Sequence, residues 1–325
     1  MHPAFSIIFL TTLIGAGQGL FLALYSGQLY AAFKVLPAQD PLHFYALGSL
    51  LALALLVAGL VSSFFHLGRP GRAWRAASQW RTSWMSREVI VLPAFMATVA
   101  VWGLIQYSGW NPLLFTFGNS YAVDLLLVSS VVATVFCFAL FLCTGMIYAA
   151  IKMLQEWATP LTVINYTLFG SASGFMLAAG FAAWQGSALT GFFGGWAIIL
   201  TVLVLITRAA SLFRNARIKP KSTIQTAIGI RHSHIEQKAQ GFMGGSFNTR
   251  EYFHGASGRK YKNVKWAFLI LAFPVPLCLV SAGMATNLPG LYMAAFLVQY
   301  IGLILERWFF FAQANHPQNL YYQTI

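Results

Sequence analysis

Eight apolar stretches, each long enough to cross a lipid bilayer, constrain the fold of this chain more than any other feature. They cover residues 5–33, 44–65, 87–108, 123–151, 162–184, 192–212, 264–285 and 291–312. A span needs about 20 mostly apolar residues to cross the hydrocarbon core. Because lipid offers backbone groups no hydrogen-bond partner, runs of this length must be α-helical. The sequence therefore predicts an all-α integral membrane protein with eight transmembrane helices.

The composition agrees with a membrane protein and argues against a soluble one. Hydrophobic residues make up 58% of the chain and charged residues only 8%, whereas soluble domains have roughly 45–50% and 25%. No basic stretch precedes the first apolar run and no small-residue cleavage site follows it. We therefore expect this run to be a permanent span and not a signal peptide. Residues 1–325 are predicted to form a single polytopic membrane domain.

The basic residues predict how the chain is oriented in the membrane. An even number of spans places both termini on one side. That side also carries the segments 66–86, 152–161 and 213–263, and with the span ends it holds all 20 lysines and arginines except Lys34. Basic residues close to spans are retained in the cytoplasm. We therefore expect both termini, the 213–263 loop insertion and the 313–325 tail to be cytoplasmic. This topology accounts for the net charge of +13 better than nucleic-acid binding, which needs a soluble basic face.

Ionisable residues gather near the cytoplasmic ends of the second, third and eighth spans. They are His66, Arg69, Arg72, Glu88, Glu306 and Arg307. Charges inside a membrane are costly, and by default they mark a functional site or a mutual pair. We expect these residues to converge at one depth, just inside the membrane.

Quinone chemistry suits such a cluster at the boundary between lipid and cytoplasm. Reduction of a quinone moves two electrons and two protons together. A histidine can hydrogen-bond a quinone carbonyl, and carboxylates can carry protons in from water. Arginines would stabilise the anionic forms of a reduced quinone in a low-dielectric pocket. The six residues therefore predict a quinone-binding site.

The electrons for this chemistry must come from another protein. No histidine lies inside an apolar run, so the paired ligands of a membrane haem are missing. The three cysteines, Cys137, Cys143 and Cys278, lie in apolar runs without Cys-x-x-Cys spacing, and we interpret them as small core residues. We expect no haem, iron–sulfur cluster or other metal in this chain. A partner docked on the cytoplasmic side must then supply the electrons.

Structural interpretations of the same residues stay open. The loop arginines could be ordinary positive-inside anchors beside interfacial tryptophans, and His66 could be a satisfied residue at a helix end. Glu88 could sit favourably in the first turn of a helix capped by Ser86. Glu306 and Arg307 could form a structural ion pair with partners on the third span.

Two other functions could use the same charges. A transporter would place them near the midplane on broken helices, whereas here they gather at one face, which makes this interpretation the weaker one. A passive anchor, whose partner holds the whole quinone site, is a further alternative. Substitution of His66 would separate it from a quinone-site subunit.

The segment between the second and third spans resembles a known family. The stretch "HLGRPGRAW" at 66–74, followed by "SREV" at 86–89, is similar to the anchor subunit family of dimethyl sulfoxide reductase, the eight-helix membrane subunit of complex iron–sulfur molybdoenzymes. The resemblance implies a haem-free anchor in the bacterial inner (cytoplasmic) membrane that exchanges electrons with menaquinone or ubiquinone. It also implies two partners, an iron–sulfur electron-transfer subunit and a molybdenum catalytic subunit. In the family pattern, His66 and Glu88 are the functional histidine and glutamate, and Arg72 is the motif arginine.

Further features resemble one branch of this family. The His66 side is predicted to face the cytoplasm, and a long basic loop separates the sixth and seventh spans. With the stretches "QGFMGGSFNTREYFHG" and "ERWFFFAQANHPQNLYYQ", these features look like the membrane subunit of cytoplasmic sulfite dehydrogenases, which oxidise sulfite and reduce quinone. The resemblance implies an anchor that passes electrons from cytoplasmic sulfite oxidation, in a partner subunit, to the quinone pool. The alternative within the family is a quinol-oxidising anchor of a dimethyl sulfoxide reductase-type enzyme.

Cysteine labelling at two positions tests the predicted orientation. Ser246→Cys lies in the long loop, and Asn287→Cys lies between the seventh and eighth spans. Because the two sites are expected on opposite faces, a membrane-impermeant thiol reagent added to intact cells should label Asn287→Cys but not Ser246→Cys. Both should react after lysis, which serves as the control. External labelling of Ser246→Cys would contradict the orientation.

Overall fold

The computed structural model describes residues 5–117, 121–219, 221, 223–236, 238 and 258–315. Within this part of the chain, eight helices are long and apolar enough to cross a membrane, so the predicted all-α fold with eight spans is confirmed. Residues 239–257 of the 213–263 loop and residues 316–325 of the tail lie outside the described residues.

Each span starts and ends close to its predicted position. The spans are α1 (Phe5–Ala32), η1 with α2 (Pro41–Ala46 and Leu47–Phe64), α3 (Trp84–Ser108), α4 (Leu125–Ala149), α5 (Pro160–Trp184), α6 (Thr190–Asn215), α9 with α10 (Gly258–Ala272 and Pro274–Thr286) and α11 (Pro289–Gln313). Within the described residues, short elements connect them: the 3-10 helix η2 (Pro70–Gln79), the antiparallel hairpin β1 (Leu113–Phe117) and β2 (Tyr121–Asp124), and α7 (Ile224–Ile228).

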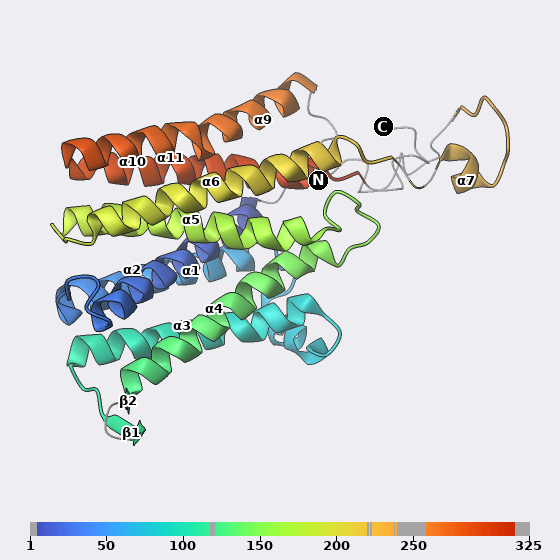
Figure 1. The fold of residues 1–325 in the computed structure, drawn as a ribbon. Coiled ribbons are helices and arrows are strands. Elements are labelled where there is room, and N and C mark those ends of the chain that lie inside the picture. The colour runs from blue at the N-terminus through green and yellow to red at the C-terminus, as the bar shows by residue number, and fades with distance from the viewer. Residues whose placement is uncertain are drawn as a thin grey trace.

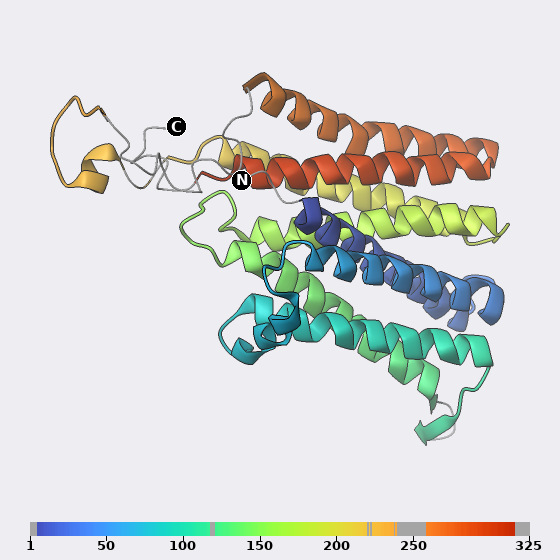
Figure 2. The same ribbon diagram turned by 180° about the vertical axis from the view of Figure 1, so that it is seen from behind.

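The spans run alongside one another, and their connections separate into two groups (Figure 1). At one end of the bundle lie η2, the α4–α5 connection and α7, and the described chain also begins and ends there. At the opposite end lie η1, the β1–β2 hairpin and the α5–α6 and α10–α11 connections. Figure 2 shows the same separation from behind. The described chain begins and ends at the same end of the bundle, as an even number of spans requires. Which compartment each end of the bundle faces stays a prediction.

Local side-chain hydrogen bonds determine where several helices begin. Asp124 accepts a hydrogen bond from the backbone N–H of Leu127 at 2.8 Å at the start of α4. At the start of α3, the side chain of Ser83 accepts from the N–H of Ser86. The sequence suggested Ser86 as the cap of this helix, and the structure corrects that assignment because α3 begins earlier than predicted. Glu88 therefore lies in the second turn of α3.

Helices α1 and α5 form the centre of the bundle and meet without intervening side chains. They bury more of their residues than any other span. A Cβ atom on Gly19 would lie 2.1 Å from the carbonyl oxygen of Gly170, and one on Gly174 would lie 2.0 Å from the carbonyl carbon of Gly19. Small residues allow helix backbones to approach this closely within a membrane. Glycine is thus required at this crossing by the neighbouring backbone.

The seventh span is broken, which the apolar pattern did not predict. Helix α9 ends at Ala272 and α10 begins at Pro274, with Phe273 between them. Pro274 and Pro276 lack backbone N–H groups, so they cannot continue the hydrogen-bond ladder of α9. Gln299 of α11 donates to the side-chain hydroxyl of Thr201 at 2.9 Å and lies 3.5 Å from the carbonyl oxygen of Ala272. The side chain of Gln299 therefore places a polar group beside the interrupted hydrogen-bond ladder of the seventh span.

The cysteines only partly match their interpretation as core residues. Cys137 and Cys143 are buried, but Cys278 on α10 is exposed. This difference arises because an apolar run in a membrane protein has a lipid-facing side as well as a packed side. Membership of the run therefore does not predict burial.

The close contact of α1 and α5 at Gly174 predicts that one added methyl group destabilises the protein. Gly174→Ala should lower the free energy of unfolding by about 1–3 kcal/mol, because the added methyl overlaps the backbone of α1 and the helices must separate. Gly195→Ala is the matched control, since a Cβ there meets no atom within 4 Å. Thermal unfolding of the detergent-solubilised protein measures both. Equal midpoints for the two variants would contradict the close contact between α1 and α5.

Candidate functional site

Three buried charges form an ionic cluster between α6 and α11. Oε1 of Glu306 lies 2.7 Å from Nε of Arg208, and Oε2 of the same carboxylate accepts a hydrogen bond from Nε of Arg307 at 2.6 Å. The three residues are at most 2% exposed. A lone charge at this depth would be strongly destabilising, so each arginine depends on the shared carboxylate. We call these three residues the buried ionic cluster.

The buried ionic cluster carries one more positive charge than negative, and its surroundings compensate for this excess. The guanidinium of Arg307 lies 4.0 Å from the centre of the Tyr166 ring, and aromatic faces attract cations. Glu156, in the connection between α4 and α5, lines a small cavity together with Arg208 and Arg307. Burial raises the pKa of Glu156 above its ordinary value. The carboxyl group of Glu156 is thus a candidate acceptor for a proton from outside the bundle.

Glu88 lies apart from the buried ionic cluster and has its own partner. Its carboxylate accepts a hydrogen bond from the hydroxyl of Thr144 on α4. The two residues line a cavity of about 10 Å³, which is near the minimum needed for one water molecule. Tyr166 lines this cavity as well as the one beside Glu156, which has the same volume. Tyr166 thus separates Glu88 from the buried ionic cluster.

The predicted residues of the loop lie on the surface. His66 follows the end of α2, Arg69 precedes η2, Arg72 lies within η2, and all three are exposed. Partial burial lowers the pKa of His66, so the imidazole is neutral at pH 7, with one nitrogen that donates and one that accepts. The segment η2 packs against α3, the helix that carries Glu88. Figure 2 shows η2 beside the first turns of α3.

Arg87 secures this loop to the start of α3. Its Nε donates to the carbonyl of Trp80 at 2.9 Å, and its Nη2 donates to the carbonyl of Arg81 at 2.8 Å. Its guanidinium also lies 4.2 Å from the centre of the Trp84 ring. This arginine therefore has a structural role, in contrast to the exposed arginines of η2.

The six predicted site residues thus fall into three groups. His66, Arg69 and Arg72 lie on the surface, Glu88 lies between α3 and α4, and Glu306 with Arg307 belongs to the buried ionic cluster. No side-chain hydrogen bond or ion pair among the described residues joins one group to another. The alternative of an ion pair between Glu306, Arg307 and the third span is wrong, because the partner is Arg208 of α6.

Three residues of this region were missed in the sequence. Arg208 was counted only as a basic residue of the sixth span, although a charge within an apolar run is itself a signal for a buried pair. Tyr166 and Glu156 carry no motif, and only the packing of α5 beside α11 shows their relation to the charges. The charge within the sixth apolar run identifies Arg208 as a residue that needs a partner, but the sequence does not show that this partner is Glu306.

Removal of the shared carboxylate should destabilise the protein strongly. Glu306→Gln leaves Arg208 and Arg307 buried without a counter-charge, which costs about 3–5 kcal/mol in comparable pairs. Glu236→Gln is the matched control, because Glu236 pairs with Lys238 on the surface and exposed pairs contribute about 0–1 kcal/mol. The unfolding midpoints of the solubilised variants measure the difference. A Glu306→Gln protein as stable as the control would contradict the stabilising role of the cluster.

Comparisons with known proteins place the chain in a family. The family model described as the DMSO reductase anchor subunit (DmsC) matches residues 1–313. The chain is also 57% identical over 325 residues, the full length of both proteins, to a sulfite dehydrogenase subunit from Allochromatium vinosum. The predicted resemblance is thereby confirmed over eight spans and not only around the motif. This chain belongs to the DMSO reductase anchor subunit family.

Proposed function

We propose that this chain is the membrane anchor and quinone-site subunit of a molybdenum and iron–sulfur oxidoreductase. In this proposal it passes electrons from cytoplasmic sulfite oxidation to the quinone pool. Family membership supports the anchor role, and the name of the 57% identical relative supports sulfite as the substrate of a partner subunit. Within the chain, the place of Glu88 is the observation that carries the proposal.

Glu88 combines the properties of a proton carrier at a membrane boundary. It is half-buried, it lies in the second turn of α3, and its carboxylate is held by Thr144. The adjoining cavity holds about one water and excludes a quinone head group. A head group must therefore approach from the loop side, where His66 and Arg72 are exposed.

Each exposed group has a role in this arrangement. Uptake of two electrons and two protons converts a quinone into a quinol. The neutral imidazole of His66 donates a hydrogen bond to a quinone carbonyl and holds the head group in place. Arg69 and Arg72 supply positive charge where negative charge develops on the oxygens. The two electrons come from the iron–sulfur partner, and Glu88 delivers the two protons one after the other, regaining each proton from its water-sized cavity.

Tyr166 offers a route by which Glu88 regains its proton. Its hydroxyl is buried beside the side chains of Arg307 and Tyr148, and the residue lines both water-sized cavities. A proton held by Glu156 could pass through one water to this hydroxyl and through a second water to Glu88. Because the pKa of Glu156 is raised by burial, its carboxyl group holds a proton at a higher pH than an exposed glutamate does.

The exposed loop also fits a contact surface for the partner subunits. Trp74 and Trp80 are 71% and 53% exposed, and η2 has no buried residue. Large aromatic side chains with arginines between them are typical of interface anchors. An iron–sulfur subunit seated here would bring its electrons beside His66. The molybdenum subunit would then lie farther from the membrane.

The His66→Ala variant tests the quinone role directly. In membranes that carry the complete complex, it should still oxidise sulfite with a soluble artificial acceptor. Its quinone reduction should fall by about tenfold or more, because a hydrogen bond to the head group is lost. Glu88→Gln should also keep sulfite oxidation and lose quinone reduction, since the amide cannot supply a proton.

The control variant is His43→Ala at the opposite end of the same span. His43 pairs on the surface with Asp40 at 2.8 Å, and its loss should leave quinone reduction unchanged. Unaltered quinone turnover in His66→Ala would refute the proposed site. A complete complex that reduces dimethyl sulfoxide with quinol and shows no sulfite-dependent quinone reduction would refute the proposed direction and substrate.

A further inference from the structure

A second cavity lies at the end of the bundle opposite to η2. It has a volume of about 470 Å³ and is bounded by the last turns of α1 and α3, by η1 and by the start of α4. Small-molecule sites usually occupy about 300–1,000 Å³. Gln106 of this cavity and Glu88 lie 18 residues apart on α3, or about 27 Å along the helix. The cavity is therefore separate from the site proposed above.

Two buried polar groups of this cavity lack a hydrogen-bond partner in the part of the chain that the structure describes. The hydroxyl of Tyr45 and the amide Nε2 of Gln106 have no hydrogen bond within the described residues, although the two residues are only 3% and 5% exposed. Buried donors almost always have a partner in a folded protein. Both residues line the cavity, so a molecule inside it would satisfy them.

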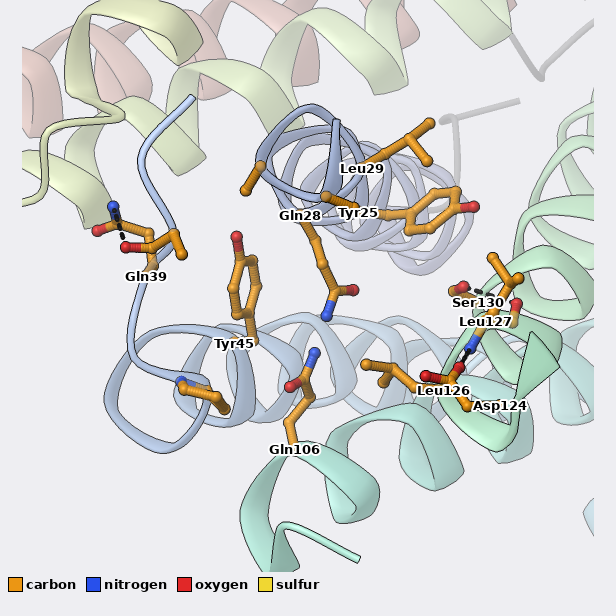
Figure 3. A pocket seen from close by; sticks show the side chains of 14 residues that line it. Tyr25, Gln28, Leu29, Gln39, Tyr45, Gln106, Asp124, Leu126, Leu127 and Ser130 are labelled. Carbon is orange, nitrogen blue, oxygen red and sulfur yellow. Dashed lines mark hydrogen bonds between the residues drawn. The ribbon is translucent and has the colours of Figure 1, made fainter. Parts of the chain in front are cut away.

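A third donor faces the same space and has a fixed orientation. Oε1 of Gln28 accepts a hydrogen bond from Nε1 of Trp102 at 3.1 Å, which turns its amide nitrogen the other way. Figure 3 shows the side chains of Gln28 and Gln106 extending toward one another with their nitrogens facing, and Tyr45 beside them. Two N–H groups cannot bond to each other. An acceptor atom between them would bond to both.

The lining also limits the charge of an occupant. Among the described residues that line the cavity there is no lysine or arginine, so a phosphate or carboxylate would meet no cation from them. The carboxylate of Asp124 at the rim is already bonded to the N–H of Leu127 and to the side chain of Asn111, and its charge disfavours an anion. Leucine, alanine and proline make up most of the remaining lining. The site therefore suits a neutral, largely apolar molecule with acceptor atoms.

We propose that this cavity binds the carbonyl group of a neutral membrane amphiphile, a chemistry that quinones share with glycerolipid esters. The amide nitrogens of Gln28 and Gln106 hold one carbonyl oxygen between them, and the Tyr45 hydroxyl donates to a further acceptor. The apolar walls receive the ring or chain. The inference does not depend on the proposed quinone site at His66.

Photolabelling of the full-length protein in native membranes tests this inference. The probes are a short-tailed azidoquinone and a photoreactive phosphatidylcholine, and mass spectrometry locates the label. At least one probe should label residues 38–46 or 102–108. Competition with excess short-tailed ubiquinone would assign the site to a quinone, and competition with excess phosphatidylcholine alone would assign it to a glycerolipid.

The variants Gln106→Leu and Tyr45→Phe each remove one donor. Each should reduce labelling of these segments about tenfold, the usual effect of one lost hydrogen bond in a buried site. The control is Tyr107→Phe, because Tyr107 is a neighbour on α3 and is 69% exposed. Labelling near His66 should be unchanged in all three, which separates this cavity from the first site.

A second measurement tests the inference without a photoreactive probe, because a probe whose reactive group points away from the protein would give no label even when it is bound. Short-tailed ubiquinone or phosphatidylcholine should raise the unfolding temperature of the wild type and of Tyr107→Phe more than that of Gln106→Leu. Absence of label in both segments together with equal shifts in all variants would overturn the inference. Such a result would assign the cavity to water alone.

Discussion

The backbone contact between α1 and α5 is the constraint on which the rest of the structure depends. Without side chains between Gly19 and Gly174, the central pair lies close enough for α2, α4, α6 and α11 to pack around it. Dispersion forces at such contacts replace the hydrophobic effect, which gives helices little reason to associate inside lipid. The position of α5 in turn places Tyr166 between Glu88 and the buried ionic cluster.

The charges of this protein divide by depth into two kinds. Arg208, Glu306 and Arg307 satisfy one another in the interior, and this arrangement is typical of charges that stabilise one packing of helices. The arginines of η2 and His66 lie on the surface, where they remain free to meet another molecule. Glu88 is intermediate, because it is half-buried and its hydrogen-bond partner within the described chain is a neutral hydroxyl. An intermediate position of this kind suits a group that must gain and lose a proton.

The sequence alone predicts the spans well, because the bilayer imposes one length and one composition on every crossing helix. It also predicts that Glu306 and Arg307 need partners, because their depth makes solitary charges too costly. It does not predict that the partner is Arg208, since this depends on the rotation of α6 against α11. The break at Phe273 was also missed, because hydropathy measures how apolar a segment is and does not register that Pro274 and Pro276 lack a backbone N–H group. The cavity at Gln106 could not be foreseen, because four separate segments bound it.

The break at Phe273 also makes one position of α11 intolerant of a side chain. A Cβ atom on Gly302 would lie 2.4 Å from the backbone nitrogen of Ala272 and 2.6 Å from the carbonyl carbon of Leu271, where α9 ends. Small residues let helix backbones approach this closely inside a membrane. Any larger residue at position 302 would therefore push the last turn of α9 away from α11, beside the interruption of the seventh span.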